Sequence, residues 1–323
     1  MFQTSLCKIL GIKYPIIQGA LGGANRPVSD SALIANVSNA GGLGILSTWN
    51  LHSTYILNEI SKIRKLTDKP FGVNVAASHS SYDFSKKAKL IANAGVKIVT
   101  TGRGDPNIPA ISILKEYEII VMPVVGSVRQ AVSVAEKGAD AVVASGCEAG
   151  GHVGDITTMA LVPQVVDAVK IPVVAAGGIG DSRGFLAALA LGASGVQMGT
   201  RFVITNETVL PSVLKNKILQ AVADDTVITT MRTGWPTRVL RSRFTDEWEE
   251  LTKKEASPKE LRDFRRKVSN SVKQNIEEDT IGTGQVCGLF HDIKGASEVI
   301  DEMVNGAYKL VFSLAEMCHK KSC

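Results

Sequence analysis

Eight short apolar segments recur at similar intervals through the first two-thirds of the chain, and this repeat limits the fold more than any other feature. Each segment is continuously apolar and rich in aliphatic residues, as expected of a strand that is buried on both faces. The segments begin at Tyr14, Gly42, Pro70, Lys97, Ile119, Ala141, Val173 and Gly195. Amphipathic helical stretches separate them, and several end at a glycine suited to a helix C-cap: Gly41, Gly95, Gly138 and Gly192.

Eight consecutive β-then-α units predict an α/β fold, a (β/α)8 TIM barrel with parallel strands inside and helices outside. An open doubly wound sheet is the rival arrangement, but eight units of similar length favour closure. We expect residues 1–205 and 286–323 to form the barrel, with an amphipathic helix closing the chain. Residues 206–285 are polar and rich in charge, which predicts a mostly helical insertion that covers the barrel mouth.

The composition is that of a soluble globular protein, with 45% hydrophobic and 21% charged residues among 323. No apolar run approaches the roughly 18 residues of a membrane span, and the N-terminus lacks the apolar core of a signal peptide. The five cysteines form no CxxC pair, which favours neither a disulfide framework nor a metal site. The net charge of +5 is mild, so nucleic acid is not an expected partner. We therefore expect a cytoplasmic protein with a small-molecule substrate.

Glycine-rich sequences end the seventh and eighth predicted strands. Gly177 and Gly178 end the seventh, and Gln197, Met198, Gly199 and Thr200 end the eighth. Barrels of this type bind phosphate groups after these two strands. Glycine lets backbone N–H groups approach phosphate oxygens closely, and a threonine hydroxyl adds a donor. The glycines could also serve only as turns, but two such loops at these positions predict a phosphate site.

The sixth predicted strand leads into the sequence SGCEAGGH, which ends at His152. An imidazole at the barrel mouth can reach a ligand and titrates near neutral pH, so His152 is the candidate acid–base residue. A structural histidine is the alternative. Cys147 lies in the same loop, where a buried small residue is favoured over a nucleophilic thiolate.

Three more residues are placed to contact a bound ring system. Asn74 ends the third predicted strand, where an inward amide among aliphatic residues needs a hydrogen-bond partner. The edge of a flavin would supply that partner, and a hydrogen bond within the core is the alternative. Gln18 and Gly19 end the first predicted strand and are placed in the same way.

Taken together, these motifs resemble the nitronate monooxygenase family, formerly called 2-nitropropane dioxygenase, and its relative, the flavin-dependent enoyl-acyl-carrier-protein reductase II. The likeness runs in order over roughly residues 8–205, from YPIIQGALGG and SNAGGLGIL through DKPFGVNV, GCEAGGHVG and LVPQVVDAV to IPVVAAGGIGDSRG and GVQMGTRF. The resemblance implies FMN as cofactor and His152 as catalytic residue. It also implies these binding positions: Gln18, Gly19, Asn74, Gln164, Gly177, Gly178, Gln197, Met198, Gly199 and Thr200.

The resemblance implies oxidation of alkyl nitronates by O2 to a carbonyl compound and nitrite. The main alternative is an NAD(P)H-dependent reductase of enoyl thioesters on acyl carrier protein. The first loop, GALGGAN, differs from the GGMAW of those reductases, and GGHVG differs from the GGHRG of one monooxygenase class. Lesser alternatives are a non-catalytic flavin or nucleotide sensor and an inosine-monophosphate-dehydrogenase-like enzyme that uses Cys147. A homodimer is compatible with each alternative.

Overall fold

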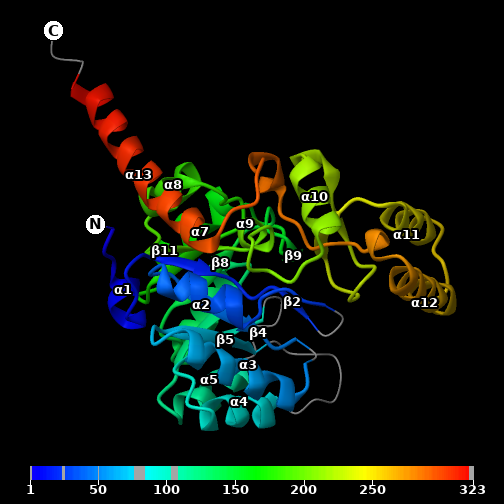
Figure 1. Cartoon of the computed structure of the whole chain (residues 1–323), viewed down its shortest axis with the longest axis horizontal. Coiled ribbons are helices and arrows are strands. Elements are labelled where there is room, and N and C mark those ends of the chain that lie inside the picture. The colour runs from blue at the N-terminus through cyan, green and yellow to red at the C-terminus, as the bar shows by residue number, and fades with distance from the viewer. Residues whose placement is uncertain (1, 24–25, 50, 76–83, 103–107, 320–323) are drawn as a thin grey trace.

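Eight parallel strands form a closed barrel in the computed structural model, which describes residues 2–23, 26–49, 51–75, 84–102 and 108–319 (Figure 1). The strands are β1 (Ile16–Gln18), β4 (Leu43–Ser47), β5 (Phe71–Val75), β6 (Ile98–Thr101), β7 (Ile120–Val125), β8 (Val142–Ser145), β10 (Val173–Ala176) and β11 (Gly195–Met198). All of them lie inside the segments that the sequence predicted as strands. Since β1 pairs with both β4 and β11, the sheet has no free edge. The TIM barrel prediction is confirmed, and the open sheet is wrong.

Helices surround the barrel and connect its strands (Figure 1). They are α2 (Ser31–Asn39), α3 (Ser53–Leu66), α4 (Phe84–Asn93), α5 (Ile108–Lys115), α6 (Val128–Glu136), α7 (Thr158–Ala168), α8 (Ser182–Ala190) and α9 (Thr200–Val203). Asp30, Ser127 and Asp181 begin α2, α6 and α8, where their side-chain oxygens accept backbone N–H groups. The predicted capping glycines all have positive φ: Gly41, Gly95, Gly138 and Gly192.

The apolar core has two layers, one on each side of the barrel wall. The outer layer lies between strands and helices. The inner layer fills the barrel and includes Ile17, Ile45 and Val143, together with side chains from α1 (Ser5–Leu10). Because side chains alternate along a strand, the residues two positions beyond Ile17, Ile45 and Val143 face the barrel mouth. The strands themselves therefore decide which residues can meet a ligand.

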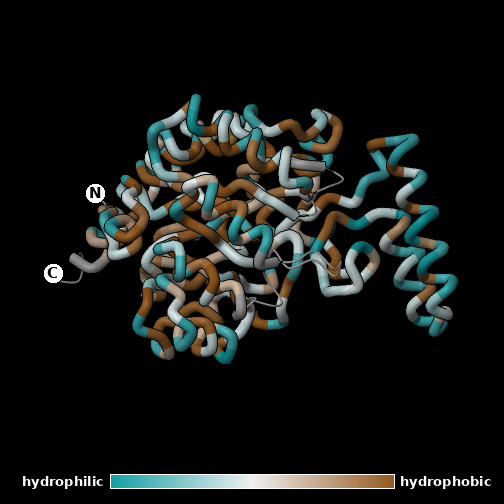
Figure 2. Tube along the Cα trace, turned by 90° about the horizontal axis from the view of Figure 1, so that it is seen from below, coloured by the Kyte–Doolittle hydropathy of each residue, from teal (hydrophilic) through white to brown (hydrophobic). Residues whose placement is uncertain are grey.

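Residues 206–285 contain a small antiparallel sheet as well as helices, and the prediction of a mostly helical insertion did not include it. β12 (Thr226–Thr229) pairs with β13 (Thr237–Leu240), which in turn pairs with β9 (Gly151–His152). The helical elements are α10 (Ser212–Gln220), η1 (Ala223–Asp225), α11 (Arg243–Lys253), α12 (Pro258–Gln274) and η2 (Ile276–Glu278). Figure 2 shows α11 and α12 as a largely hydrophilic pair that projects from the barrel. The division into barrel and insertion stays a prediction.

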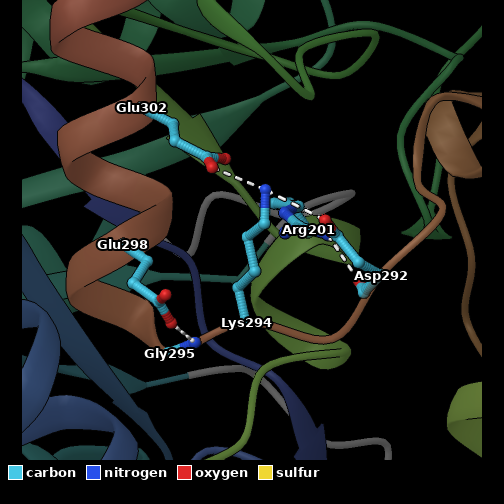
Figure 3. A network of polar contacts seen from close by, with 6 residues as sticks. All are labelled: Arg201, Asp292, Lys294, Gly295, Glu298 and Glu302. Carbon is cyan, nitrogen blue, oxygen red and sulfur yellow. Dashed lines mark hydrogen bonds and ion pairs between the residues drawn. The ribbon is translucent and has the colours of Figure 1, made fainter.

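The chain ends in the predicted helix, α13 (Ala296–His319), which packs on α8 and α2. A polar network fixes its first turns (Figure 3). Buried Arg201 contacts Asp292 at 3.0 Å, and Lys294 lies between Asp292 at 2.9 Å and Glu302 of α13 at 2.5 Å. The network joins the end of the barrel to the closing helix. Among the described residues, no helix is long and apolar enough to span a bilayer.

Candidate active site

A cavity of about 690 Å³ lies over the C-terminal ends of the barrel strands. Its floor is formed by one inward-facing residue from each strand or its end: Gly19, Ser47, Asn74, Thr100, Val124, Ser145, Ala176 and Gln197. Loops after the strands form one part of the wall, and residues from 232–237 and 279–286 form another. Active sites of TIM barrels lie at this end of the strands.

Asn74 provides a buried, unused acceptor in this floor. Its side chain is 8% exposed, and its Nδ2 donates a hydrogen bond to Thr100 Oγ1 at 2.9 Å. No group among the described residues donates to its Oδ1. The alternative, a hydrogen bond within the core, therefore satisfies the amide nitrogen of Asn74 but not its oxygen. An N–H at the edge of a flavin ring would satisfy the other half.

Gly19 keeps the floor open at the end of β1. A Cβ atom at Gly19 would lie 2.9 Å from Cδ of Gln197, so any side chain there would displace the glutamine. Gly19 N–H donates to Met198 O at 2.9 Å, which fixes the loop after β1 against β11. Gly19 and Gln197 therefore lie close together at one side of the cavity.

The turns after β10 and β11 present backbone donors to the cavity. Gly177 and Gly178 have φ of 88° and 67°, a conformation that residues with a side chain rarely adopt. Among the described residues, no acceptor takes the N–H of Gly178 or Gly199. Thr200 Oγ1 accepts the N–H of Gly284 at 2.9 Å, which leaves the hydroxyl proton for a ligand. Converging N–H and O–H donors fit a phosphate group.

Glu148 fixes the position of the turn at Gly177 and Gly178 through Thr158. Its carboxylate accepts the Thr158 N–H at the start of α7, at 2.9 and 3.0 Å. The Thr158 hydroxyl lies 2.9 Å from Gly177 O, and the Gln285 N–H donates to Glu148 O at 2.9 Å. Glu148 also lines the cavity, so it links the loop after β8 to both neighbouring segments.

His152 lies in the cavity wall and takes its orientation from three directions. Its backbone belongs to β9, which pairs with Thr237 of β13. Its Nε2 lies 3.2 Å from Thr233 Oγ1, and its ring lies over that of Trp49 with centroids 5.2 Å apart and planes at 34°. A titratable ring with a defined direction is what acid–base or charge-holding chemistry at this position requires.

The structure does not bring two of the predicted binding residues to the cavity. Gln18 faces away from the barrel interior, because strand alternation directs Ile17 and Gly19 inward, and its Oε1 accepts the Ile45 N–H at 3.1 Å. Gln164 is exposed on α7, where its Nε2 donates to Ala160 O at 2.6 Å. The other predicted positions all line the cavity: Gly19, Asn74, His152, Gly177, Gly178, Gln197, Met198, Gly199 and Thr200.

Cys147 does not line the cavity, and burial raises the pKa of its thiol, with the charge of Glu148 acting in the same direction. Both observations favour a small structural residue over a nucleophilic thiolate, although Cys147 is only partly buried and not fully buried as predicted. Trp49 was also missed, although an aromatic residue directly after the second strand could have been found by its position. Thr233 could not, since its place beside His152 depends on the pairing of β9 with β13.

Comparisons with known proteins agree with this geometry. A family model described as nitronate monooxygenase matches residues 3–83 and 76–306. The solved structure of FabK from Thermotoga maritima has a TM-score of 0.89 and 38% identity, covering 98% of this chain and 99% of its own.

Two curated relatives carry different names. A (3aS,4S,5R,7aS)-5-hydroxy-7a-methyl-1-oxo-octahydro-1H-indene-4-carboxyl-CoA dehydrogenase of Mycobacterium tuberculosis is 34% identical over 94% of this chain and 95% of its own. A probable nitronate monooxygenase of Staphylococcus saprophyticus is 35% identical over 75% of this chain and 79% of its own. By the extent of the family match and these identities, the chain belongs to the nitronate monooxygenase family of oxidoreductases, in which a flavin is the typical cofactor.

Proposed function

We propose that the chain is an FMN-dependent oxidoreductase of the nitronate monooxygenase type. The observation that carries the proposal is the position of His152 in the wall of a cavity whose lining has donors and an acceptor with no partner among the described residues. The donors are the N–H groups of Gly178 and Gly199, and the acceptor is Asn74 Oδ1. These groups suit a ring system that carries one phosphate group at the ends of β10 and β11.

In this proposal, each part of the floor has its own task. Gly178, Gly199 and Thr200 hold the phosphate through N–H and O–H donors. Asn74 holds a ring N–H, and Gly19 with Gln197 leaves space for the ring. FMN, when bound, supplies two-electron chemistry and reaction with O2.

His152 acts on the substrate. A nitronate carries negative charge on its oxygens, and a protonated imidazole binds that charge, whereas a neutral imidazole removes the α-proton of a neutral nitroalkane. Contact with Thr233 and Trp49 directs the ring toward one side of the cavity. The products are a carbonyl compound and nitrite, formed from the nitronate and O2.

Reduction of an enoyl thioester by NADH or NADPH is the second candidate, on acyl carrier protein or on coenzyme A. One specific observation favours it. FabK, an enoyl-acyl-carrier-protein reductase II, and a dehydrogenase named for a CoA thioester both match nearly the whole chain. In this alternative His152 donates or holds a proton at the thioester. The sensor alternative is less favoured because His152 faces the cavity. The alternative that uses Cys147 is not favoured by the position of that thiol.

Anaerobic reduction of the bound flavin separates the candidates. A small alkyl nitronate, NADH and NADPH are added in separate samples while the flavin absorbance is recorded. We expect bleaching by the nitronate and recovery with nitrite release when O2 is admitted. Bleaching by NADH or NADPH alone, reversed by a crotonyl thioester, would establish the second candidate instead. A flavin that none of the three reduces would overturn both.

We also propose a cytoplasmic enzyme that acts as a homodimer. The thiols of Cys7, Cys147 and Cys287 are free, which agrees with a reducing compartment. The exposed apolar side chains near the end of α13, Phe312 and Met317, agree with a subunit contact. Light scattering of the purified protein measures the assembly directly.

A further inference from the structure

The loop between β12 and β13 places two exposed side chains at the rim of the cavity. Arg232 and Trp235 both line the cavity, and Trp235 is 48% exposed. Tryptophan and arginine are among the residue types that contribute most to binding once a partner covers them. We call the loop from 230 to 236 the rim loop.

The rim loop is held from the side of the helical pair. Arg265 of α12 donates from Nε to Met231 O at 2.7 Å and from Nη2 to Thr230 O at 3.3 Å. Trp248 Nε1 of α11 donates to Thr230 Oγ1 at 3.2 Å. Met231 is buried in a small core with side chains of α11 and α12, including Trp248 and Phe264. The two projecting helices therefore support the loop that carries Arg232 and Trp235.

The same loop is held from the side of the barrel. Thr233 Oγ1 contacts His152 Nε2 at 3.2 Å and accepts the Trp235 N–H at 3.2 Å. Thr237 Oγ1 donates to Trp235 O at 3.0 Å. Gly234 closes the turn with φ of 80°, and its N–H donates to Thr230 O at 2.9 Å. The rim loop and the candidate catalytic histidine thus form one connected unit.

The chemistry of the rim fits a nucleotide. An indole face stacks on a planar heterocycle, and a guanidinium group binds phosphate. Arg232 donates from Nη1 to Thr280 O at 2.5 Å, and its other N–H groups have no acceptor among the described residues. Arg232 and Trp235 lie three positions apart in one turn, and both line the same cavity.

We propose that the rim loop binds the adenosine phosphate part of a coenzyme, with the base on Trp235 and a phosphate on Arg232. Coenzyme A and the pyridine nucleotides both carry this group. The inference rests on the proposed function for its biological use, but binding needs no turnover. The reactive end of the coenzyme then extends past Thr233 toward His152.

Isothermal titration of the purified protein with coenzyme A, NAD⁺, NADP⁺ and 4′-phosphopantetheine tests the proposal. We expect saturable binding of at least one adenosine coenzyme. Trp235→Ala should weaken it roughly tenfold or more, because base stacking contributes about that factor, and Trp235→Phe should retain most of it. Arg232→Ala should weaken it severalfold and reduce its dependence on salt. Binding of 4′-phosphopantetheine, which lacks adenosine, should be insensitive to Trp235→Ala.

Two exposed residues outside the rim provide matched controls. Leu66→Ala on α3 removes an exposed apolar side chain, and Arg262→Ala on α12 removes an exposed guanidinium. Neither should change coenzyme binding. If Trp235→Ala weakens only the binding of coenzyme A, the rim loop binds the adenosine of a thioester substrate. If it weakens only the binding of NAD⁺ or NADP⁺, the rim loop binds the adenosine of the reductant.

Equal binding of every adenosine coenzyme by wild type and Trp235→Ala would overturn the inference. Absence of binding to the wild type at millimolar concentration would overturn it as well. The flavin absorbance of each sample is recorded separately. A protein without flavin contradicts the proposed function, whereas the titration still decides whether the rim binds adenosine.

Discussion

His152 owes its direction to neighbours from distant parts of the chain. β9 is two residues long, so it cannot orient the ring without its pairing to β13. Trp49 restricts the ring from one side, and Thr233 contacts Nε2. At the scale of single residues, the proposed chemistry depends on this one imidazole and on main-chain donors on the other side of the cavity.

Replacement of His152 by alanine tests that division of tasks. The variant should keep its flavin, because the phosphate is held by Gly178 and Gly199. Turnover of a neutral nitroalkane should fall by about 10²–10⁴-fold, as expected for loss of a residue that transfers a proton. The measurements are the flavin-to-protein absorbance ratio and steady-state oxygen uptake.

The same variant shows whether His152 acts as a base or as a group that binds negative charge. If His152 acts as a base, the defect should be mild on a substrate that is supplied already as the nitronate anion. Comparable defects on both substrates would indicate that the imidazolium binds negative charge. Wild-type activity on all substrates would contradict any role for His152 in the reaction.

Cys147 should react slowly with alkylating agents near neutral pH. Burial, assisted by the negative charge of Glu148, raises the pKa of its thiol above the ordinary value of 9.0, so little thiolate forms. The rate of iodoacetamide labelling at Cys147, followed by mass spectrometry, should rise only at alkaline pH. Cys147→Ser should retain turnover. Rapid labelling at neutral pH, with loss of activity, would revive a nucleophilic role.

At the scale of elements, the barrel could be predicted because each strand carries its own signal. Continuous apolar runs and capping glycines are local, and closure follows from the number of units. The same local pattern predicts that Asn74 faces the mouth. The pattern also indicates that Gln18 does not face the mouth. Ile17 belongs to the inner apolar layer, so strand alternation turns the side chain of Gln18 outward.

Long-range pairing is what the sequence could not reveal. β12 and β13 are four residues each and lie in a polar region, so neither shows a clear strand pattern. The pairing of β13 with β9 depends on tertiary packing between segments more than 80 residues apart in sequence. For this reason Thr233 and Trp235 were not assigned to the site. Gln164 was assigned through family resemblance alone, and its helix directs it to solvent.

Asp181, which begins α8 after the turn at Gly177 and Gly178, should contribute a stability that depends on pH. Burial alone would raise its pKa, but hydrogen bonds from the Arg183 side chain and from the N–H groups of Arg183 and Gly184 outweigh this effect. The net pKa lies below the ordinary value of 3.8, so the stabilisation is present above that pH and is lost as pH falls through the folded-state pKa.

Asp181→Ala should lower the free energy of unfolding by about 0.5–2 kcal/mol near neutral pH, the usual effect of removing an N-cap. Asp181→Asn should cost less, because asparagine also caps helices. Urea unfolding near pH 7 and near pH 3 measures both differences. The difference between wild type and Asp181→Ala should shrink in acid, and an unchanged difference at the lower pH would contradict the assigned charge effect.

At the scale of the whole molecule, the barrel and residues 206–285 meet at one cavity. The strand ends supply the floor, and the later residues supply one wall together with the rim loop. Arg201, Asp292 and Lys294 connect the end of the barrel to α13 (Figure 3). The central claim that follows from this assembly is that the cavity holds FMN with its phosphate at the ends of β10 and β11.

Identification of the released cofactor tests that claim most directly. The purified protein is denatured, and the supernatant is separated by chromatography against FMN and FAD standards. We predict a yellow protein that releases FMN at about one molecule per chain. Release of FAD, or a colourless protein that does not take up added FMN, would contradict the account.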